Sequence, residues 1–240
     1  MRCNIKYAGR GALLVCAMLV GACATTTAND PRDPLEGFNR GVYSFNQAMD
    51  NALFDPLGKV YQAITPDIVD RGITNIFSNL NDIAVVANDI LQFKINQALA
   101  DGIRFIYNST AGIAGFFDVS TAIDMPKHDE DFGQTLAVWG VGSGPYLVVP
   151  FFGPSSFRDV TGHIVDRGIL SPLFYINDDA LKAGLLTLNY VDFKADLLTA
   201  KKLVGEAAVD EYEFVKNAYF DKRDNQIHDR TSSVYPGDEE

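Results

Sequence analysis

Large apolar residues recur three and four positions apart in the segment that follows residue 32. Asp33-Pro34-Leu35-Glu36 opens this pattern with a residue suited to cap a helix, a proline suited to its first position and an acid near its positive end. The apolar positions share one helical face: Leu35, Phe38, Val42, Phe45, Met49 and Leu53. The pattern predicts a helix from Asp33 to about Leu53.

The same spacing recurs along the rest of the chain. Further helical segments are expected at about 65–80, 83–93, 94–107, 178–203 and 206–220. The polar pair Asn81-Asp82 is interpreted as the break between the first two of these. Alternation with a period of two is confined to Thr135–Trp139 and Tyr146–Val149, both too short to indicate a sheet protein. The predicted fold class is therefore mainly α.

An uninterrupted apolar run, Gly11 to Val20, follows three basic residues at the start of the chain. The run is too short to cross a membrane as a helix, which takes roughly 20 residues. A basic start, a short apolar run and the small residues Gly21 and Ala22 are typical of a secretory signal peptide. We therefore expect residues 1–22 to be removed on export.

Val20-Gly21-Ala22-Cys23 also resembles the lipobox of bacterial lipoproteins, in which the cysteine carries lipid. Cys23 is the cysteine that survives cleavage, so it has no internal disulfide partner. Acyl chains on Cys23 would hold the protein on a membrane, because each buried methylene contributes about 0.8 kcal/mol. The alternative is an ordinary signal peptide with an incidental thiol. Ala24, by resemblance to lipoprotein sorting rules, favours the outer membrane over the inner one.

Charge narrows the choice of partner. Removal of residues 1–22 takes away three positive charges and would change the formal net charge from −11 to −14. Nucleic acid is excluded as a partner, because phosphate binding needs clustered Lys and Arg. The same acidity argues against electrostatic docking on anionic lipid, so contact with a membrane would have to be hydrophobic.

The acidic excess is concentrated at the carboxyl end. Residues 206–240 hold ten acidic and four basic side chains, and the last part has too few apolar groups to order itself. The expected organisation is a signal peptide (1–22), a lipidated tether (23–32), one helical domain (33–222) and an acidic disordered tail (223–240).

Three stretches contain no charged residue: 105–117, 132–157 and 168–177. The middle one is dense in glycine and proline, which break helical hydrogen bonding, so it is not a membrane-spanning helix. Two interpretations stay open. The stretches are ordinary core, or some of them face lipid, which an acyl anchor at Cys23 would favour.

Enzyme motifs give no support. Gly140-Val141-Gly142-Ser143-Gly144-Pro145 carries a proline where a nucleotide-binding loop needs its third glycine, and no G-x-S-x-G of a serine hydrolase is present. His128–Asp131 is explained by a solvated acidic loop, and the spacing Asp159, His163, Asp166 by polar contacts at a helix end, rather than by a metal. No cofactor, metal or catalytic residue is predicted.

A series of ordered motifs resembles one known family. The motifs are Asp33–Arg40, Phe77–Leu80, Arg104–Thr110, Asp131–Leu136, Trp139–Tyr146, Pro150–Ser155 and Arg158-Asp159. Their order and spacing are similar to those of the MlaA (VacJ) family of lipoproteins, over roughly residues 33–220. The resemblance does not cover the tail beyond about residue 225.

The resemblance implies a ring-shaped helical body embedded in the inner leaflet of the outer membrane, with an amphipathic central channel. It implies a role in removing phospholipid that has strayed into the outer leaflet and passing it to a periplasmic carrier of the MlaC type. Because members from enteric bacteria sit beside trimeric porins, a porin is a candidate partner.

Several residues are candidates for the lipid path. Gly140, Gly142 and Gly144 would supply hinges in an irregular, mobile part of the pore wall. Asp159, His163 and Asp166 would lie on a polar lining, because a charged head group is costly to bury in hydrocarbon. Arg158 would meet lipid phosphate or pair with a carboxylate. Phe38 and Asn39, in the family's opening motif, would shape the pore from the first helix, although Phe38 and Phe45 also fit a plain core.

Three classes of function stay in competition. A lipid-transport lipoprotein accounts for the uncharged Gly/Pro-rich middle, which a structural or assembly lipoprotein of the outer membrane does not need. A lipid-tethered periplasmic hydrolase would need a nucleophile and a base that the sequence does not offer.

Overall fold

The computed structural model describes residues 30–230. The predicted signal peptide, the lipidation site Cys23, residues 24–29 of the tether and residues 231–240 of the tail lie outside the described residues.

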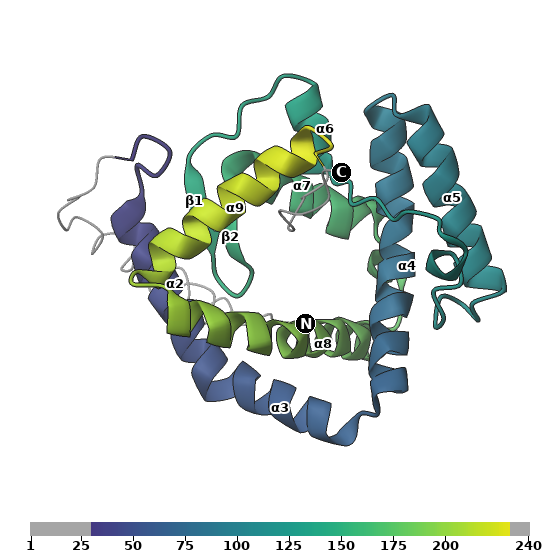
Figure 1. The fold of residues 1–240 in the computed structure, drawn as a ribbon, viewed down its shortest axis with the longest axis horizontal. Coiled ribbons are helices and arrows are strands. Elements are labelled where there is room, and N and C mark those ends of the chain that lie inside the picture. Colours follow the sequence, from purple (N-terminus) through teal and green to yellow (C-terminus); the bar gives the residue numbers. More distant parts are fainter. Residues whose placement is uncertain (1–29, 231–240) are drawn as a thin grey trace, which may run out of the picture.

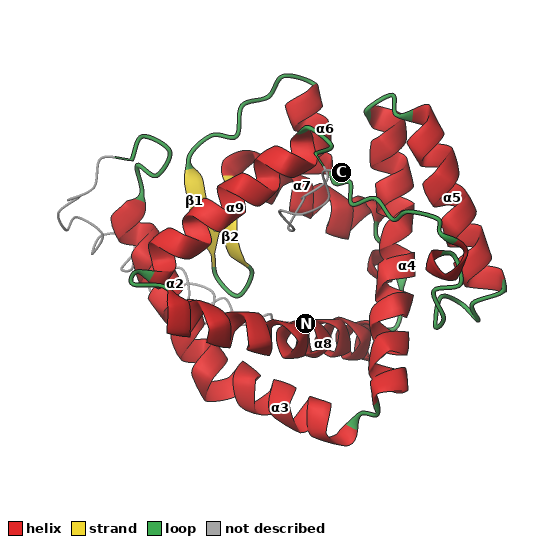
Figure 2. Cartoon of the chain, viewed as in Figure 1, coloured by secondary structure: helices red, strands yellow, loops and turns green. Residues whose placement is uncertain are grey.

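The described chain is mainly α and its helices are arranged in a ring, which confirms the predicted fold class (Figure 1). The chain begins with α2 (Glu36–Met49), a π-helical segment (Asp50–Phe54) and α3 (Asp55–Ile64), followed by the antiparallel pair α4 (Asp67–Leu91) and α5 (Ile95–Thr110). The remaining elements follow in the order α6 (Phe132–Val138), β1 (Tyr146–Val149), β2 (Gly153–Ser156), α7 (Phe157–Val165), a second π-helical segment η3 (Asp166–Leu170), α8 (Asp179–Ala207) and α9 (Glu211–Ile227). α8 packs along α3 and closes the ring (Figure 1). Two short 3₁₀ segments, Thr121–Ile123 and Pro172–Tyr175, lie in the connections (Figure 2).

The first helix begins at Glu36, and Asp33 is not its cap. The residue at the cap position is Leu35, which forms no side-chain cap hydrogen bond. Asp33 is buried, and its carboxylate accepts hydrogen bonds from the Asn39 side chain and the Tyr212 hydroxyl. The capping prediction was wrong because tertiary partners from α9 occupy the carboxylate that a local rule assigns to the helix end.

The pair Asn81-Asp82 does not break α4, which continues unbroken for 25 residues. Asp82 is buried inside the helix pair, where its carboxylate pairs with Lys127. An ion pair to a loop replaces the local backbone hydrogen bonds through which Asp usually disrupts a helix interior. The expected start of the next helix at Lys94 is confirmed, since α5 begins at Ile95.

The Gly/Pro-rich middle is more regular than expected. Thr135–Val138 belongs to the helix α6, and Trp139 is the residue that ends it. The helix is capped at its start by Asp131, whose carboxylate accepts from the Gln134 backbone N–H at 2.9 Å. The alternation at Tyr146–Val149 does form a strand, β1, paired antiparallel with β2. The irregular backbone is limited to the connection 139–145 and the hairpin turn around Phe151.

The carboxyl-terminal helix is longer than the pattern predicted. α9 runs to Ile227, so residues 223–227 are helical rather than part of a disordered tail. Arg223 is buried there and binds two carboxylates. At the other end, Arg32 of the predicted tether donates to the Asn217 side chain of α9. Polar contacts thus order residues that a count of apolar groups assigned to the tails.

Candidate functional site

The helix α5 carries its apolar face outward. Its exposed side chains include Ile95, Leu99, Ile103 and Ile106, and Leu99 is 62% exposed and Ile106 58%. The residues that α5 buries are Ala98, Asp101, Arg104 and Asn108. A helix in water hides its apolar face, so this helix is oriented for an apolar surrounding.

The same inversion holds across the described residues. Polar and charged residues make up 24 of the 32 buried side chains, whereas 35 large apolar side chains are exposed. A body in water exposes few contiguous apolar patches and buries charges only when they are paired. All three uncharged stretches are exposed in part, since Ile113, Trp139, Phe152 and Phe174 are among the exposed residues, which favours the lipid-facing interpretation over ordinary core.

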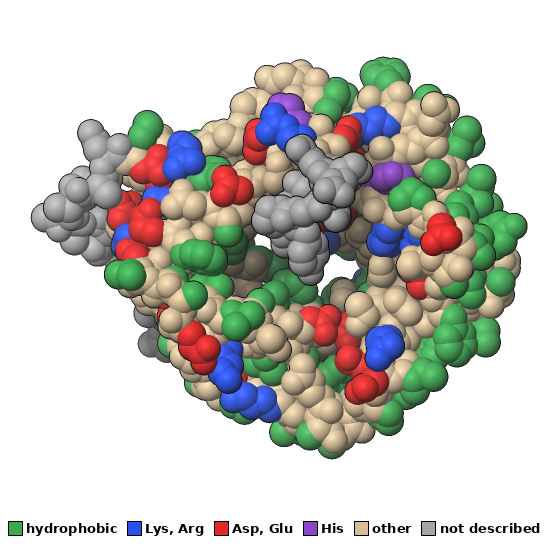
Figure 3. Space-filling model, in the orientation of Figure 1, with side chains coloured by type: hydrophobic (Ala, Val, Ile, Leu, Met, Phe, Trp, Pro, Cys, Tyr) green, Lys and Arg blue, Asp and Glu red, His purple; other side chains and the backbone are tan. Residues whose placement is uncertain are grey.

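The ring is hollowed at its centre in the space-filling view (Figure 3). Acidic and basic side chains and apolar side chains lie around this hollow, while green apolar side chains cover much of the outer edge beside α4 and α5. No helix within residues 30–230 has the length and apolarity needed to cross a membrane.

A charged network joins α6, α7 and α9 on one side of the ring. The Arg223 guanidinium donates to both oxygens of Asp131 at 2.6 and 2.7 Å and to both oxygens of Asp159 at 2.9 and 3.0 Å. Arg158 donates to Asp159 at 3.0 Å, and the Tyr219 hydroxyl donates to it as well. Burial acts to raise the pKa values of Asp131 and Asp159, but these bonds hold both pKa values below their usual range.

Two glycines allow α6 and α7 to approach closely enough for this network. A β-carbon at Gly162 would lie 2.4 Å from the Gly133 nitrogen, and one at Gly133 would lie 2.5 Å from the Arg223 guanidinium. Beside the crossing, Asp166 accepts from the Phe132 N–H at 3.0 Å and from the Asn88 side chain at 2.9 Å. This last bond ties the π-helical segment η3 to α4.

Two asparagines one heptad apart fasten α2 to the hairpin. Asn39 donates to the Tyr146 carbonyl at 3.0 Å and accepts from the Val148 N–H at 2.9 Å. Asn46 repeats this arrangement with the Val149 carbonyl at 3.0 Å and the Phe151 N–H at 2.8 Å. The two side-chain amides thus take the place of a neighbouring strand along the edge of β1.

Four of the candidate lipid-path residues are buried and fully engaged. Asn39 is 0% exposed, Asp159 2%, Arg158 8% and Asp166 9%. Arg158 pairs with the Asp159 carboxylate, which is one of the two roles that the sequence left open for it. The prediction that Asp159 and Asp166 lie on an open polar lining was wrong as to their position, because both are buried and bonded within the wall. Asn39 and Arg158 bond within the same wall, and a role of any of the four in the lipid path stays a prediction.

His163 and the unpredicted Arg167 lie differently. Both side chains are accessible to solvent. Surrounding protein nevertheless lowers the pKa of each by burial. The Arg167 guanidinium rests over the Phe152 ring at 4.7 Å and forms no ion pair within residues 30–230. Its position four residues after His163 was the signal that could have pointed to it.

The structure describes the positions of the remaining candidates, the three glycines and Phe38, and their role in the lipid path stays a prediction. Gly140, Gly142 and Gly144 are exposed in the irregular connection, and the positive φ angles of Gly140 (87°) and Gly144 (66°) require glycine there. Phe38 is half-buried on α2. Within residues 30–230, no group of three or more His, Cys, Asp or Glu residues is arranged to hold a metal ion.

A helical ring with an apolar outside and a polar inside defines a class of protein built to lie in a lipid layer. The chain belongs to the MlaA lipoprotein family, whose model matches residues 31–226. It is 34% identical over 213 residues to the "Intermembrane phospholipid transport system lipoprotein MlaA" of Escherichia coli (strain K12), covering 86% of this chain and 83% of that one. The protein of the same name from Haemophilus influenzae is 26% identical over 223 residues, covering 90% and 89%.

A solved structure resembles the ring as a whole. The match has a TM-score of 0.71 and 30% identity and covers 81% of this chain and 98% of that one, in work described as "Structural basis for maintenance of bacterial outer membrane lipid asymmetry". A protein of Rickettsia felis with no assigned function is 32% identical over 195 residues, covering 81% of this chain and 78% of that one.

Proposed function

We propose that this protein is a lipid-anchored component of the outer membrane that removes mislocalised phospholipid from the outer leaflet and passes it to a periplasmic carrier, so that lipid asymmetry is maintained. One observation carries the proposal: the apolar side chains of α5 and its neighbours face outward while the middle of the ring is hollow and bordered by charged groups. The names of the relatives supply the substrate class.

The inverted body suits the physical problem of moving a phospholipid. Its charged head group is costly to place in hydrocarbon, whereas its acyl chains lose nothing by staying there. The ring offers lipid an apolar rim and offers the head group a polar middle. Moving lipid onto a carrier makes and breaks no covalent bond, so the proposal needs no catalytic residue.

Arg167 is the residue that we assign to the phosphate of a passing head group, in place of the buried Arg158. Its guanidinium carries a full charge, is accessible, and has no carboxylate partner in the described chain. Guanidinium groups bind phosphate oxygens through two parallel hydrogen bonds. His163 lies one turn earlier, and its lowered pKa favours a neutral imidazole, which can still donate one hydrogen bond.

The partners follow from the same proposal. A carrier of the MlaC type would receive lipid on the periplasmic side, and a trimeric porin is a candidate neighbour in the membrane. The acyl anchor at Cys23 would keep the ring at the bilayer while the body itself has no spanning helix among residues 30–230.

The first test is the amount of phospholipid in the outer leaflet of cells that lack this gene, measured with a surface lipid reporter. We expect phospholipid to accumulate, and the native protein, but not Cys23→Ser, to reverse the accumulation. An unchanged leaflet would refute lipid removal and leave a structural role.

A second test addresses the passage. Arg167→Gln should leave at least half of the excess lipid in place, while Arg167→Lys, which keeps the charge, should restore most of the removal. Lys222→Gln is the matched control, because Lys222 is an exposed cation of α9 with no ion pair in the described chain. Equal activity of Arg167→Gln and the native protein, at equal protein levels, would remove Arg167 from the path.

A further inference from the structure

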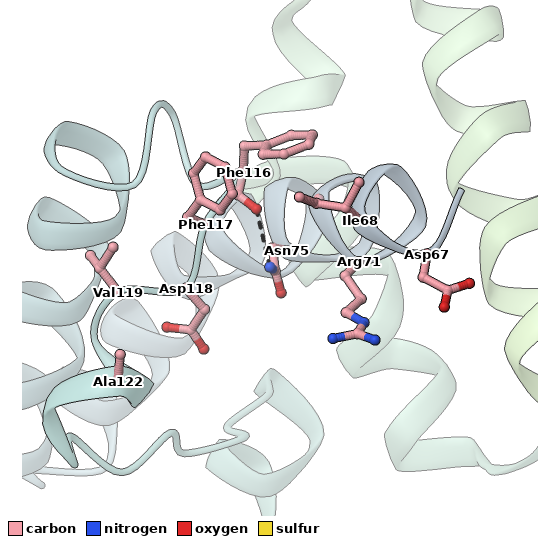
Figure 4. Close-up of a pocket in the computed structure, with 10 residues that line it drawn as sticks. Asp67, Ile68, Arg71, Asn75, Phe116, Phe117, Asp118, Val119 and Ala122 are labelled. Atoms are coloured by element: carbon pink, nitrogen blue, oxygen red, sulfur yellow. Dashed lines mark hydrogen bonds between the residues drawn. The ribbon is translucent and has the colours of Figure 1, made fainter. Parts of the chain in front are cut away.

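A pocket beside α4 lies apart from the network that joins α6, α7 and α9. A pocket of about 660 Å³ opens between the start of α4 and the segment 116–122 that follows α5 (Figure 4). Its lining is mostly apolar and includes Ile68, Phe116, Phe117, Val119 and Ala122. Neither the sequence motifs nor the proposed passage makes use of this pocket.

The chain builds the pocket with an unusual turn. After α5 ends, Ile113, Ala114 and Gly115 all have positive φ angles, which reverses the backbone and returns Phe116 to α4. Gly72 receives the Phe116 ring, since a β-carbon there would lie 2.1 Å from it. The Asn75 side chain then donates to the Phe116 carbonyl at 3.1 Å, as Figure 4 shows. The apolar back wall is therefore fixed in place.

Two opposite charges project into the same pocket. The side chains of Asp67 and Arg71 leave α4 on one side, one helical turn apart (Figure 4). Both are exposed, and neither forms an ion pair or a side-chain hydrogen bond within residues 30–230. Neighbours at this spacing have β-carbons roughly 5–6 Å apart and would gain only about 0.3–0.5 kcal/mol by pairing, so a ligand can displace such a contact.

The third charge of the pocket is already neutralised. The Asp118 carboxylate accepts from the buried Arg104 at 3.1 Å and from Asn108 at 3.0 Å, and these bonds with those from Thr121 lower its pKa to about 2. What remains available to a ligand is one guanidinium, one carboxylate and an apolar wall.

We propose that this pocket binds a zwitterionic phospholipid, with the phosphate on Arg71, a primary ammonium on Asp67 and an acyl chain against Phe116 and Phe117. A bidentate guanidinium suits a phosphate diester, and the carboxylate completes the charge match for a head group that carries both signs. Ile64, Ile113 and Ile123, which flank the lining segments in the sequence, are all more than half exposed, and such apolar surface suits a lipid better than a free polar metabolite.

This inference rests on the proposed membrane location of the ring but not on passage through its centre. A lipid held here would be the local substrate reserve or a fixed structural lipid of the rim. Failure of the pocket test therefore leaves the outer-leaflet assay untouched, and failure of that assay leaves the pocket test valid.

The experiment is photo-crosslinking of the full chain in detergent micelles. Phosphatidylethanolamine and phosphatidylglycerol that carry the same diazirine acyl chain are titrated separately, and the yield on peptides from residues 111–124 is measured by mass spectrometry. Arg71→Gln should raise the half-saturating concentration about tenfold for both lipids, because both have the phosphate. Asp67→Asn should raise it severalfold for phosphatidylethanolamine and leave phosphatidylglycerol unchanged.

Matched variants control for folding and for charge in general. Asp179→Asn removes an exposed acid from the first position of α8, as Asp67→Asn does from α4, and Lys59→Gln removes an exposed cation from α3. Both should leave the yields unchanged, and Arg71→Lys should retain most of the binding. Insensitivity to Arg71→Gln, an equal effect of Asp67→Asn on the two lipids, or full competition by inorganic phosphate would each overturn the proposal.

Discussion

Asp89 is a carboxylic acid that the fold keeps partly protonated near neutral pH. It lies on α4 with no exposed surface, and neither of its carboxylate oxygens has a donor within the described chain. Burial is the main cause that raises its pKa to about 7, helped by the negative charges of Asp101 on α5 and Glu130, and Lys94 only partly offsets them. Asp101 is itself bonded to the His128 imidazole at 2.8 Å.

The raised pKa makes the folded state less stable as pH increases. An unfolded aspartate loses its proton near 3.8, so between that pH and about 7 the folded protein binds more protons than the unfolded one. Each pKa unit is worth 1.36 kcal/mol, so ionisation of Asp89 costs about 4 kcal/mol at pH 8 and about 1 kcal/mol at pH 4.5. Asn has the shape of the protonated acid and carries no such cost.

Asp89→Asn should therefore stabilise the protein by about 3 kcal/mol more at pH 8 than at pH 4.5, or about 6–12 °C in melting temperature. The assay is thermal unfolding in detergent micelles at the two pH values. Asp124→Asn, a change at an exposed loop residue, should have an effect within about 0.5 kcal/mol at both. An equal gain at the two pH values, or a loss at pH 8, would refute the reasoning.

Three further substitutions test the contacts that hold the ring. Gly162→Ala should destabilise the protein by about 1–3 kcal/mol in thermal unfolding, because the added β-carbon meets the Gly133 backbone. The control Gly41→Ala on α2, where nothing lies within 4 Å of the added carbon, should stabilise the protein by about 0.5–1 kcal/mol. A Gly162→Ala variant as stable as the native protein would contradict the close crossing of α6 and α7. Arg223→Gln should lower the free energy of unfolding by about 3–5 kcal/mol, because it leaves the carboxylates of Asp131 and Asp159 without their partner. Part of this loss should vanish when the pH falls below the ordinary pKa of an aspartate. A loss that does not depend on pH would argue against unpaired carboxylates. Asn46→Ala should cost about 1–3 kcal/mol and speed hydrogen exchange of the Phe151 amide, and unchanged exchange would exclude the bridge.

The helical segments could be predicted from the sequence, but the side of each helix that faces the protein could not. Apolar spacing identifies a stripe, as at Ile95, Leu99, Ile103 and Ile106, and in water that stripe would form the core. Here it faces outward, and only the uncharged stretches and the expected anchor at Cys23 hinted at this. The spacing of apolar residues does not show whether their face is turned toward the protein or away from it. The surrounding medium, water or lipid, decides which face is buried.

The errors in the candidate site share one physical cause. Asp33 was assigned a local role as a helix cap, Asp159 an exposed one on the polar lining, and Asn39 a role in shaping the pore from the first helix. All three are buried and bonded to residues more than 60 positions away: Asp33 to Tyr212, Asn39 to the hairpin and Asp159 to Arg223. Sequence spacing does not reveal such distant pairs. Arg167 and Arg71 form no ion pair in the described chain, and they could be recognised as free cations only once the structure had shown which cations are paired.

The distribution of charge explains how so acidic a chain can handle phosphate. A formal net charge of −11 would repel an anionic group if the carboxylates were free. Inside the ring many of them are engaged: Asp131 and Asp159 by Arg223, Asp118 by Arg104, and Glu130 by Lys94 at 2.8 Å. A carboxylate paired with a cation contributes little electrostatic potential at a distance. The potential close to an unpaired cation is therefore set mainly by that cation. Arg167 on η3 and Arg71 in the α4 pocket are two such cations; Arg167 lies over the Phe152 ring, and Phe116 and Phe117 line the pocket of Arg71. The polar interior thus has two effects. It binds the helices together in a setting where burying apolar surface gains nothing, and it leaves unpaired the two guanidinium groups that we propose as phosphate contacts.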